Sequence, residues 1–285
     1  MKRDRYYELL ASAEERLREA LGLRPDETIQ TALVLGTGWA DAFSLKVDHT
    51  VAMQDLIGTD HDNPFVHVDA LDGHARRYEI GKVNGRRVLV LRGRVHMNEF
   101  VFNPAGKLAV RMQIELLIRL GAKTLILTTG VGSLKPEIEV GSVVFFDGWV
   151  SSWSEEMPLF AGEFKDPEEA IRIETVGELT AVAHTGFEDL SLHVGSHVYW
   201  HGPHFEGRAR DKKRMADAGG SCVSMSVKTE VAVSRLYEDV RTIPMGFVCN
   251  SPFEAMDHKH HRDVARAAAP KLGALLECLI AMVDP

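Results

Sequence analysis

An arginine and a histidine stand two residues apart in Gly93-Arg94-Val95-His96, directly after the apolar run 87–92. Extended backbone would direct both side chains to one side. A guanidinium fork can donate two parallel charge-assisted hydrogen bonds, so the pair Arg94 and His96 suits a phosphate dianion. A surface salt bridge is the alternative that the local sequence leaves open.

Other glycine-flanked residues could contribute to the same anion site. Thr37 lies between two glycines, and Gly130 follows β-branched residues, so the backbone amides of either loop could cradle an anion. His74 could join them or cap a turn. The Thr37 loop is neither a dinucleotide fingerprint, because Asp41 stands where a third glycine would be, nor a Walker A loop. A plain tight turn remains an open interpretation of each loop.

A second group of residues could recognise a heterocycle. Phe205 and Glu206 pair an aromatic face with a carboxylate, Ser226 follows Met225, and Asn250 ends an apolar run. An aromatic ring, a carboxylate and a carboxamide together could stack on a heterocycle and hydrogen bond with its edge. Taken singly, each has an ordinary explanation: a core phenylalanine, a solvated glutamate and an asparagine in a turn.

Histidines are densest in the segment Asp257-His258-Lys259-His260-His261, which opens a helical pattern. Zinc sites need a set of suitably spaced His, Cys or carboxylate ligands, and neither such a set nor an HExxH arrangement stands out here. We therefore expect no bound metal. One histidine of this cluster could instead reach a ligand site at the edge of a sheet.

The elements that must position these residues alternate between short apolar runs and helical periodicity, which is typical of an α/β fold. Strands are predicted at 31–36, 87–92, 124–129, 142–146, 196–200 and 242–248. Helices are predicted at about 5–21, 104–120, 207–218, 228–238 and 258–282. We expect a single domain, 1–285, with a central mixed, largely parallel β-sheet flanked by helices and an N-terminal helical extension over 1–28. Such sheets bind ligands where strand ends meet loops.

Composition limits the functional classes. With 33 Lys and Arg against 41 Asp and Glu, the formal net charge is −8, which argues against a general nucleic-acid-binding surface. No apolar run reaches membrane-spanning length, and the N-terminus lacks the apolar core of a signal peptide. Cys222, Cys249 and Cys278 form no CxxC pair, which favours a reducing compartment. We expect a cytoplasmic protein that binds neither nucleic acid nor membrane.

Seven motifs, in order and spacing, resemble those of the trimeric purine nucleoside phosphorylases and the related methylthioadenosine phosphorylases. They extend over about residues 33–261 and read LVLGTG, GHARR, GRVHMNE, TTGVGSLKP, GPHFE, MS…TE and VCN. A single match would carry little weight, but seven in the same order are specific. The resemblance implies an enzyme that uses inorganic phosphate, as co-substrate, to split a purine nucleoside into free purine and α-ribose 1-phosphate without metal or organic cofactor.

The resemblance also implies roles for individual residues. Phosphate would be bound by Thr37, His74, Arg94, His96, the backbone amide of Gly130 and Ser226. The base would contact Phe205, Glu206 and Asn250, and the ribose would contact Asn98, Met225 and His261, with His260 nearly as good a match as His261. Of these, Asn250, Glu206 and His96 are the expected catalytic residues, because donors aimed at the departing purine stabilise the charge it gains.

Several positions depart from the family pattern on the side of the sugar. Family members usually carry a tyrosine where this chain has Asn98 and commonly Asn-Ala-Ala where it has Thr129-Gly130-Val131, while Gly132-Ser133 is similar to the methylthioadenosine branch. The bulky Trp200 is also atypical. Asn250 favours the 6-oxopurine nucleosides inosine and guanosine over adenosine. A 5'-modified or deoxy nucleoside and a non-catalytic purine sensor are the alternatives.

The resemblance further implies a homotrimer. In that family an aromatic side chain of a neighbouring subunit completes the ribose pocket. Phe160 and Phe164 lie in the plausible region of this chain, and neither can be matched to that aromatic.

Overall fold

The computed structural model describes residues 1–68, 75–100, 103–150, 160, 190–200, 209–254 and 258–283, without the side chains of 258–262. This part of the chain contains one sheet of nine strands. The strands are β1 Thr31–Leu35, β2 Lys46–Ala52, β3 Arg77–Val83, β4 Arg86–Arg92, β5 Thr124–Ser133, β6 Val143–Val150, β7 Leu192–Tyr199, β8 Cys222–Ser224 and β9 Arg241–Asn250. The helices are α1 Arg3–Ala20, α2 Trp39–Ala42, α3 Pro104–Arg119, α5 Ala209–Asp217, α6 Lys228–Ser234 and α7 His258–Val283, with short 3₁₀ turns η1 Met53–Leu56, η2 Pro64–His67 and η3 Met97–Phe100.

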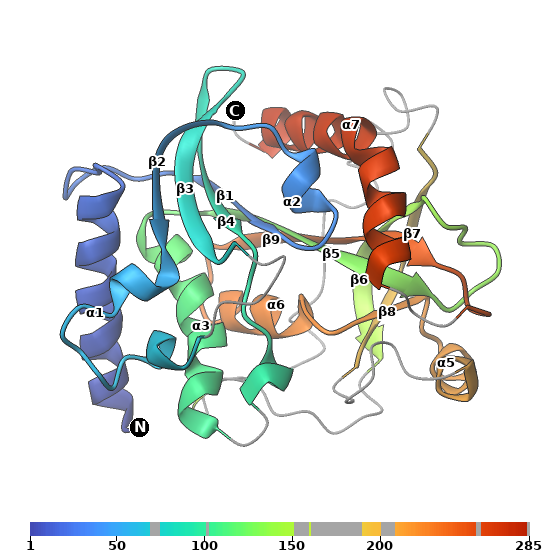
Figure 1. Cartoon of the computed structure of the whole chain (residues 1–285), viewed down its shortest axis with the longest axis horizontal. Coiled ribbons are helices and arrows are strands. Elements are labelled where there is room, and N and C mark those ends of the chain that lie inside the picture. The colour runs from blue at the N-terminus through green and yellow to red at the C-terminus, as the bar shows by residue number, and fades with distance from the viewer. Residues whose placement is uncertain are drawn as a thin grey trace.

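The sheet is mixed, as expected. Its strand order is β2-β3-β4-β1-β5-β8-β7-β6-β9, and β9 also pairs with β5, so the strands β5, β8, β7, β6 and β9 close into a ring. Strand β1 runs parallel to both β4 and β5, and β5 runs parallel to β9. Strands β2, β3 and β4 form an antiparallel meander at the opposite end of the sheet from this ring (Figure 1). The parallel centre therefore brings the carboxyl ends of β1, β4, β5 and β9 to one edge.

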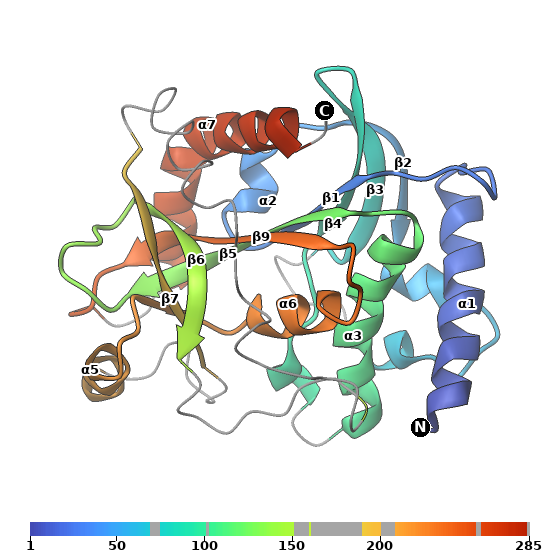
Figure 2. The same cartoon turned by 180° about the vertical axis from the view of Figure 1, so that it is seen from behind.

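Helices cover both faces of this sheet. Helices α2 and α7 lie on one side, whereas α1, α3 and α6 lie on the other (Figures 1 and 2). Alternate residues of β1 pack on opposite faces of the sheet. Ala32 and Val34 belong to the apolar cluster that includes residues of α1 and α3, and Leu33 and Leu35 belong to the cluster that includes residues of α7. A strand that is buried on both faces needs a continuous apolar run, and this run is why β1 could be predicted from the sequence.

The predicted strands and helices all occur, but the sequence missed the strands β2 and β8. The first five residues of β2 are exposed and β8 has only three residues, so neither of them shows a buried apolar run. A correction concerns the segment 129–133, which we expected to be a glycine-rich loop. It continues β5, because its backbone pairs with β9 on one side and with β8 on the other.

Candidate active site

Parallel pairing brings the ends of β1, β4 and β5 into backbone contact. The Gly36 amide donates to the Thr128 hydroxyl (3.2 Å), and the Gly93 amide donates to the Leu35 carbonyl (3.0 Å). A Cβ atom on Gly36 would lie 2.7 Å from the Thr128 carbonyl oxygen and 3.3 Å from Nη2 of Arg94. Only glycine fits between these strands, so the loops that follow them start side by side.

Thr37 and Gly130, two of the predicted phosphate-binding residues, lie against each other. A Cβ atom on Gly130 would lie 3.6 Å from the Thr37 carbonyl oxygen, an ordinary van der Waals distance. The next residue, Gly38, has φ +83° and begins α2. Trp39 in that helix donates from Nε1 to the Thr129 carbonyl (2.9 Å) and so ties the loop after β1 to β5.

Arg94 is buried, with only 1% of its side chain exposed. Its Nη1 donates to Glu230 of α6 (2.9 Å), and its Nη2 donates to the carbonyls of Val34 (3.1 Å) and Thr128. Burial lowers the pKa of Arg94 and raises the pKa of Glu230, and the attraction between the two charges opposes both shifts.

This environment changes how Arg94 can act. The surface salt bridge left open by the sequence is wrong, since the ion pair is interior. The guanidinium fork that we expected to bind an anion already donates hydrogen bonds to Glu230 and to the carbonyls of Val34 and Thr128. Within the described part of the chain, only Nε lacks a hydrogen-bond partner.

His96 is held by Glu99 of η3. One carboxylate oxygen, Oε1, accepts from the His96 backbone amide (2.8 Å) and lies 3.1 Å from Nδ1 of the ring. The other oxygen, Oε2, accepts from Nη2 of Arg76 (2.5 Å). Burial alone would raise the pKa of Glu99, but the hydrogen bonds from His96 and the charges of His96 and Arg76 hold it below its ordinary value.

The backbone between Arg94 and His96 is fixed from α3. The side-chain amide of the fully buried Gln113 accepts from the Val95 amide (3.0 Å) and donates to the Val95 carbonyl (3.1 Å). These two bonds replace the strand pairing that ends with β4. They orient the two predicted phosphate-binding side chains on either side of Val95.

Ser226 lies beside the end of β5. Its hydroxyl oxygen is 3.0 Å from that of Thr129, and both side chains are buried. The next residue, Val227, adopts φ +73°, which is rare for a β-branched side chain and marks local strain. The half-buried Met225 stands between β8 and α6. The hydroxyl of Ser226 thus lies beside the stretch of β5 that contains Thr129 and Gly130, against which the Thr37 loop also packs.

Two further predicted residues stand at this edge. Asn250 is the last residue of β9, is 1% exposed and pairs in register with Gly132 of β5. Asn98 is half-buried in the same 3₁₀ turn as Glu99, and its buried Oδ1 has no hydrogen-bond partner within the ranges described above.

Some predicted residues fall elsewhere. His74, Phe205, Glu206 and Phe164 lie outside the described residues, and so do the side chains of His260 and His261 in the first turns of α7. Phe160 packs edge-on against Tyr6 of α1 within its own chain, with ring centroids 5.5 Å apart. Trp200 packs beside a small apolar cluster that includes Val223.

The sequence interpretation missed the residues that hold the site together. Arg76, Gln113 and Glu230 were given no role, although Arg76, Glu99 and Glu230 stand inside the motifs quoted above. Arg76 and Glu230 are charged residues within motifs, and a charged side chain that becomes buried needs a partner. Looking for such charged residues inside the motifs is the signal that could have found them. Among the described residues, no group of three or more His, Cys, Asp or Glu could hold a metal, and no helix is long and apolar enough to span a bilayer.

Comparison with known proteins places this arrangement in a family. A family model described as the phosphorylase superfamily matches residues 31–281. The chain therefore belongs to the phosphorylase superfamily.

Within that superfamily, the similar curated proteins are purine nucleoside phosphorylases. The enzyme of Bos taurus is 28% identical over 74% of this chain and 76% of its own length. The Cellulomonas sp. enzyme is 28% identical over 93% of this chain and 90% of its own length, and the Mycobacterium tuberculosis enzyme is 27% identical over 88% of each. The resemblance seen in the motifs is thereby confirmed, and with it the expectation of a pentosyltransferase enzyme of the phosphorylase type.

Solved structures confirm the fold. Isoform 2 of purine nucleoside phosphorylase from Schistosoma mansoni, crystallised with cytosine and ribose-1-phosphate, aligns with a TM-score of 0.74 at 18% identity and covers 98% of this chain and 97% of that one. A second Schistosoma mansoni structure, in complex with adenosine, aligns with a TM-score of 0.71.

Proposed function

We propose that this chain catalyses the phosphorolysis of 6-oxopurine nucleosides such as inosine and guanosine, releasing the free purine and α-ribose 1-phosphate. The observation that carries the proposal is the convergence of two kinds of residue at one sheet edge. Anion donors follow β1, β4 and β8 or lie within β5, and the carboxamide of Asn250 ends the neighbouring strand β9.

Phosphate is the nucleophile in this proposal. The amides of the Thr37 loop and of Gly130 in β5, the hydroxyl of Ser226 and the ring of His96 supply donors from four separate parts of the chain. Arg94 contributes positive charge, which its ion pair with Glu230 holds in place (2.9 Å). Interior donors of this kind cost little reorganisation when the reaction proceeds, so they suit an anion that must be held in one orientation.

The base half of the reaction depends on Asn250. As the glycosidic bond breaks, the sugar gains oxocarbenium character and negative charge flows into the purine. An amide donor at N7 stabilises that charge more in the transition state than in the bound substrate. Glu206 would accept from N1–H, which 6-oxopurines have and adenine lacks. Asn250 is 1% exposed, so its hydrogen bond would form away from competing water.

A second candidate is a 5'-modified or deoxy nucleoside. It is favoured by Asn98, whose side chain is shorter than the tyrosine that family members usually carry at this position and that contacts the ribose hydroxyl. With that contact weakened, the pocket would discriminate less against a sugar that lacks the hydroxyl or carries a substituent there.

We also propose a cytoplasmic homotrimer that needs no metal or organic cofactor. The trimer is supported by the motif resemblance, and sedimentation equilibrium at several protein concentrations tests it. Phe160 already packs within its own chain, so it is a poor candidate for an aromatic that reaches a neighbouring subunit.

Specificity is tested by comparing kcat/KM across a nucleoside panel in phosphate buffer. Inosine and guanosine should exceed adenosine, 2'-deoxyinosine and 5'-methylthioinosine by at least about ten-fold, the range that one hydrogen bond to a buried partner provides. A higher value for the 5'-methylthio or deoxy substrate would favour the second candidate instead. Tight purine binding without turnover would indicate the non-catalytic sensor.

A further inference from the structure

We propose that Arg76 is a positioning residue that orients His96 through Glu99 and thereby sets the affinity for phosphate. The inference rests on the proposed function, because it assigns a part to Arg76 in the phosphate half of that site. Arg76 is the fourth residue of the GHARR motif and directly precedes β3. The motif resemblance assigned it no role.

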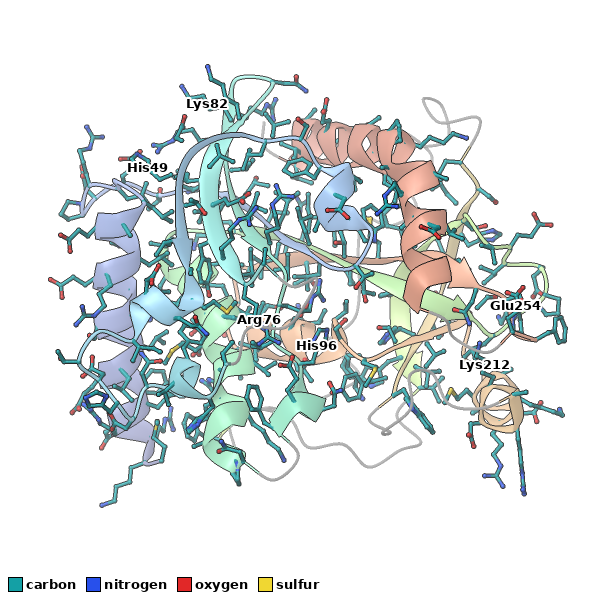
Figure 3. All side chains as sticks on the ribbon, in the orientation of Figure 1. His49, Arg76, Lys82, His96, Lys212 and Glu254 are labelled. Carbon is teal, nitrogen blue, oxygen red and sulfur yellow. The ribbon has the colours of Figure 1, made fainter. Side chains whose placement is uncertain are left out.

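The carboxylate of Glu99 divides its two oxygens between Arg76 and His96. Oε2 accepts from Nη2 of Arg76 (2.5 Å), and Oε1 faces the His96 amide (2.8 Å) and ring Nδ1 (3.1 Å). Figure 3 shows Arg76 and His96 close together beside α6. With Oε2 engaged, the carboxylate plane is fixed, and Oε1 stays aimed at the imidazole.

The orientation of the imidazole follows from that contact. A ring Nδ1–H that donates to a carboxylate leaves Nε2 as the nitrogen that faces a ligand, and the partner carboxylate fixes the ring plane. Besides Glu99, the buried Glu230 interacts electrostatically with His96, and Glu230 is itself paired with Arg94. Arg76 therefore balances the carboxylate nearest to the ring.

The backbone conformation of Arg76 indicates that surrounding contacts hold its side chain in place. Its φ of +44° lies in the left-handed region, which is unfavourable for a residue with a Cβ atom. The carbonyl oxygen of Arg76 accepts from the Met53 amide (2.9 Å), and only 5% of the side chain is exposed. Strain of this kind persists where the surrounding contacts require it.

The test uses Arg76→Gly, because glycine adopts this φ without strain and the variant removes only the side chain. We expect the KM for phosphate to rise about ten-fold, by analogy with the loss of residues that orient metal-binding histidines, while kcat and the KM for nucleoside change less than about two-fold. Guanidinium ion at millimolar concentration should restore part of the phosphate affinity by occupying the space beside Glu99.

The matched control is Arg77→Met. Arg77 is the next residue, and its Nε donates to Glu79 (2.5 Å), so this variant loses the ion pair of a neighbouring, more exposed arginine that contacts neither Glu99 nor His96. We expect its phosphate KM to equal that of the wild type. If Arg76→Gly does not fold, Arg76→Lys carries the test. That variant keeps the cation but loses the planar fork, and a rise of about three-fold in the phosphate KM is expected.

An unchanged phosphate KM in folded Arg76→Gly, an equal rise in Arg77→Met, or the absence of guanidinium rescue would overturn the inference. Failure of the proposed function is recognised separately, as absence of turnover in the wild type. In that case calorimetric titration of inorganic phosphate into the wild type and Arg76→Gly decides the inference. An affinity loss of about ten-fold in the variant supports the positioning role, and equal affinities contradict it.

Discussion

Asn250 is the residue on which the chemical proposal depends most. Replacing it with alanine should lower kcat for inosine about 10²–10³-fold, because a donor that strengthens in the transition state is lost, whereas the KM for phosphate should change less than about three-fold. Steady-state kinetics with each substrate varied separately measures both effects. Asn250→Asp, which keeps the size but lacks the amide donor, should lose as much activity on inosine. Equal losses in kcat and in phosphate affinity would refute this role.

His197 makes stability depend on pH. It is fully buried on β7, it is 2.8 Å from the hydroxyl of Ser224, and burial lowers its pKa from 6.5 to about 3. The unfolded chain therefore takes up a proton below about pH 6.5 that the folded chain refuses, so folding free energy is lost as pH falls from 6.5 toward 3.

This loss can be measured by urea unfolding at pH 7 and pH 5. Between these values the histidine should remove about 2 kcal/mol, at about 1.4 kcal/mol per pH unit below 6.5. His197→Gln keeps an amide near Ser224 but does not titrate, so its free energy of unfolding should fall by about 2 kcal/mol less than that of the wild type. Identical pH dependence in the two proteins would show that His197 is not held neutral by the fold.

At the scale of elements, Gly38 joins β1 to α2 and allows α7 to approach. Its φ is +83°, and a Cβ atom there would lie 2.5 Å from the Cβ of Ala265. Gly38→Ala should therefore cost backbone strain plus a clash, together about 2–4 kcal/mol of unfolding free energy.

Gly85 is the matched control for Gly38. It also has φ +83°, but no atom lies within 4 Å of its Cβ position. Gly85→Ala should therefore cost only the strain, about 1 kcal/mol. Thermal or urea unfolding separates the two variants, and equal destabilisation would show that contact with α7 contributes nothing.

Helix α5 is tied to the segment that follows Asn250. Nζ of the buried Lys212 donates to the carbonyls of Ser251 (3.1 Å) and Glu254 (3.0 Å), and Figure 3 shows Lys212 and Glu254 side by side. We expect Lys212→Met to raise the KM for nucleoside about ten-fold with little change for phosphate, because two hydrogen bonds from a buried cation to this segment are lost. Lys213→Met removes an exposed lysine that pairs with Asp217 of the same helix, and it should behave as the wild type. A similar effect of both variants would contradict the assignment.

At the scale of the whole molecule, the sequence predicted the strands that are buried on both faces and the helices that cover them. It could not predict β2, whose exposed residues show no apolar run. It also missed the partner of Arg94, since Glu230 is 136 positions away and meets Arg94 only when α6 packs beneath the parallel strands. Motif resemblance selected the site residues, but the pairings that hold them depend on tertiary contacts that no local pattern contains.

The parallel centre of the sheet connects the two halves of the proposed reaction. Strand β5 pairs with β1 on one side and with β9 on the other, so residues of the proposed anion site and Asn250 have this strand as a common neighbour. The proposal therefore requires both halves to act on one substrate, with phosphate consumed in the step that releases the base.

The most direct test is to incubate the purified wild-type protein with inosine, with and without inorganic phosphate, and to follow hypoxanthine by a coupled assay and ribose 1-phosphate by ³¹P NMR. The account predicts that hypoxanthine forms only when phosphate is present and in equal amount to ribose 1-phosphate. Hypoxanthine release at the same rate without phosphate, or no turnover of any purine nucleoside by folded protein, would contradict it.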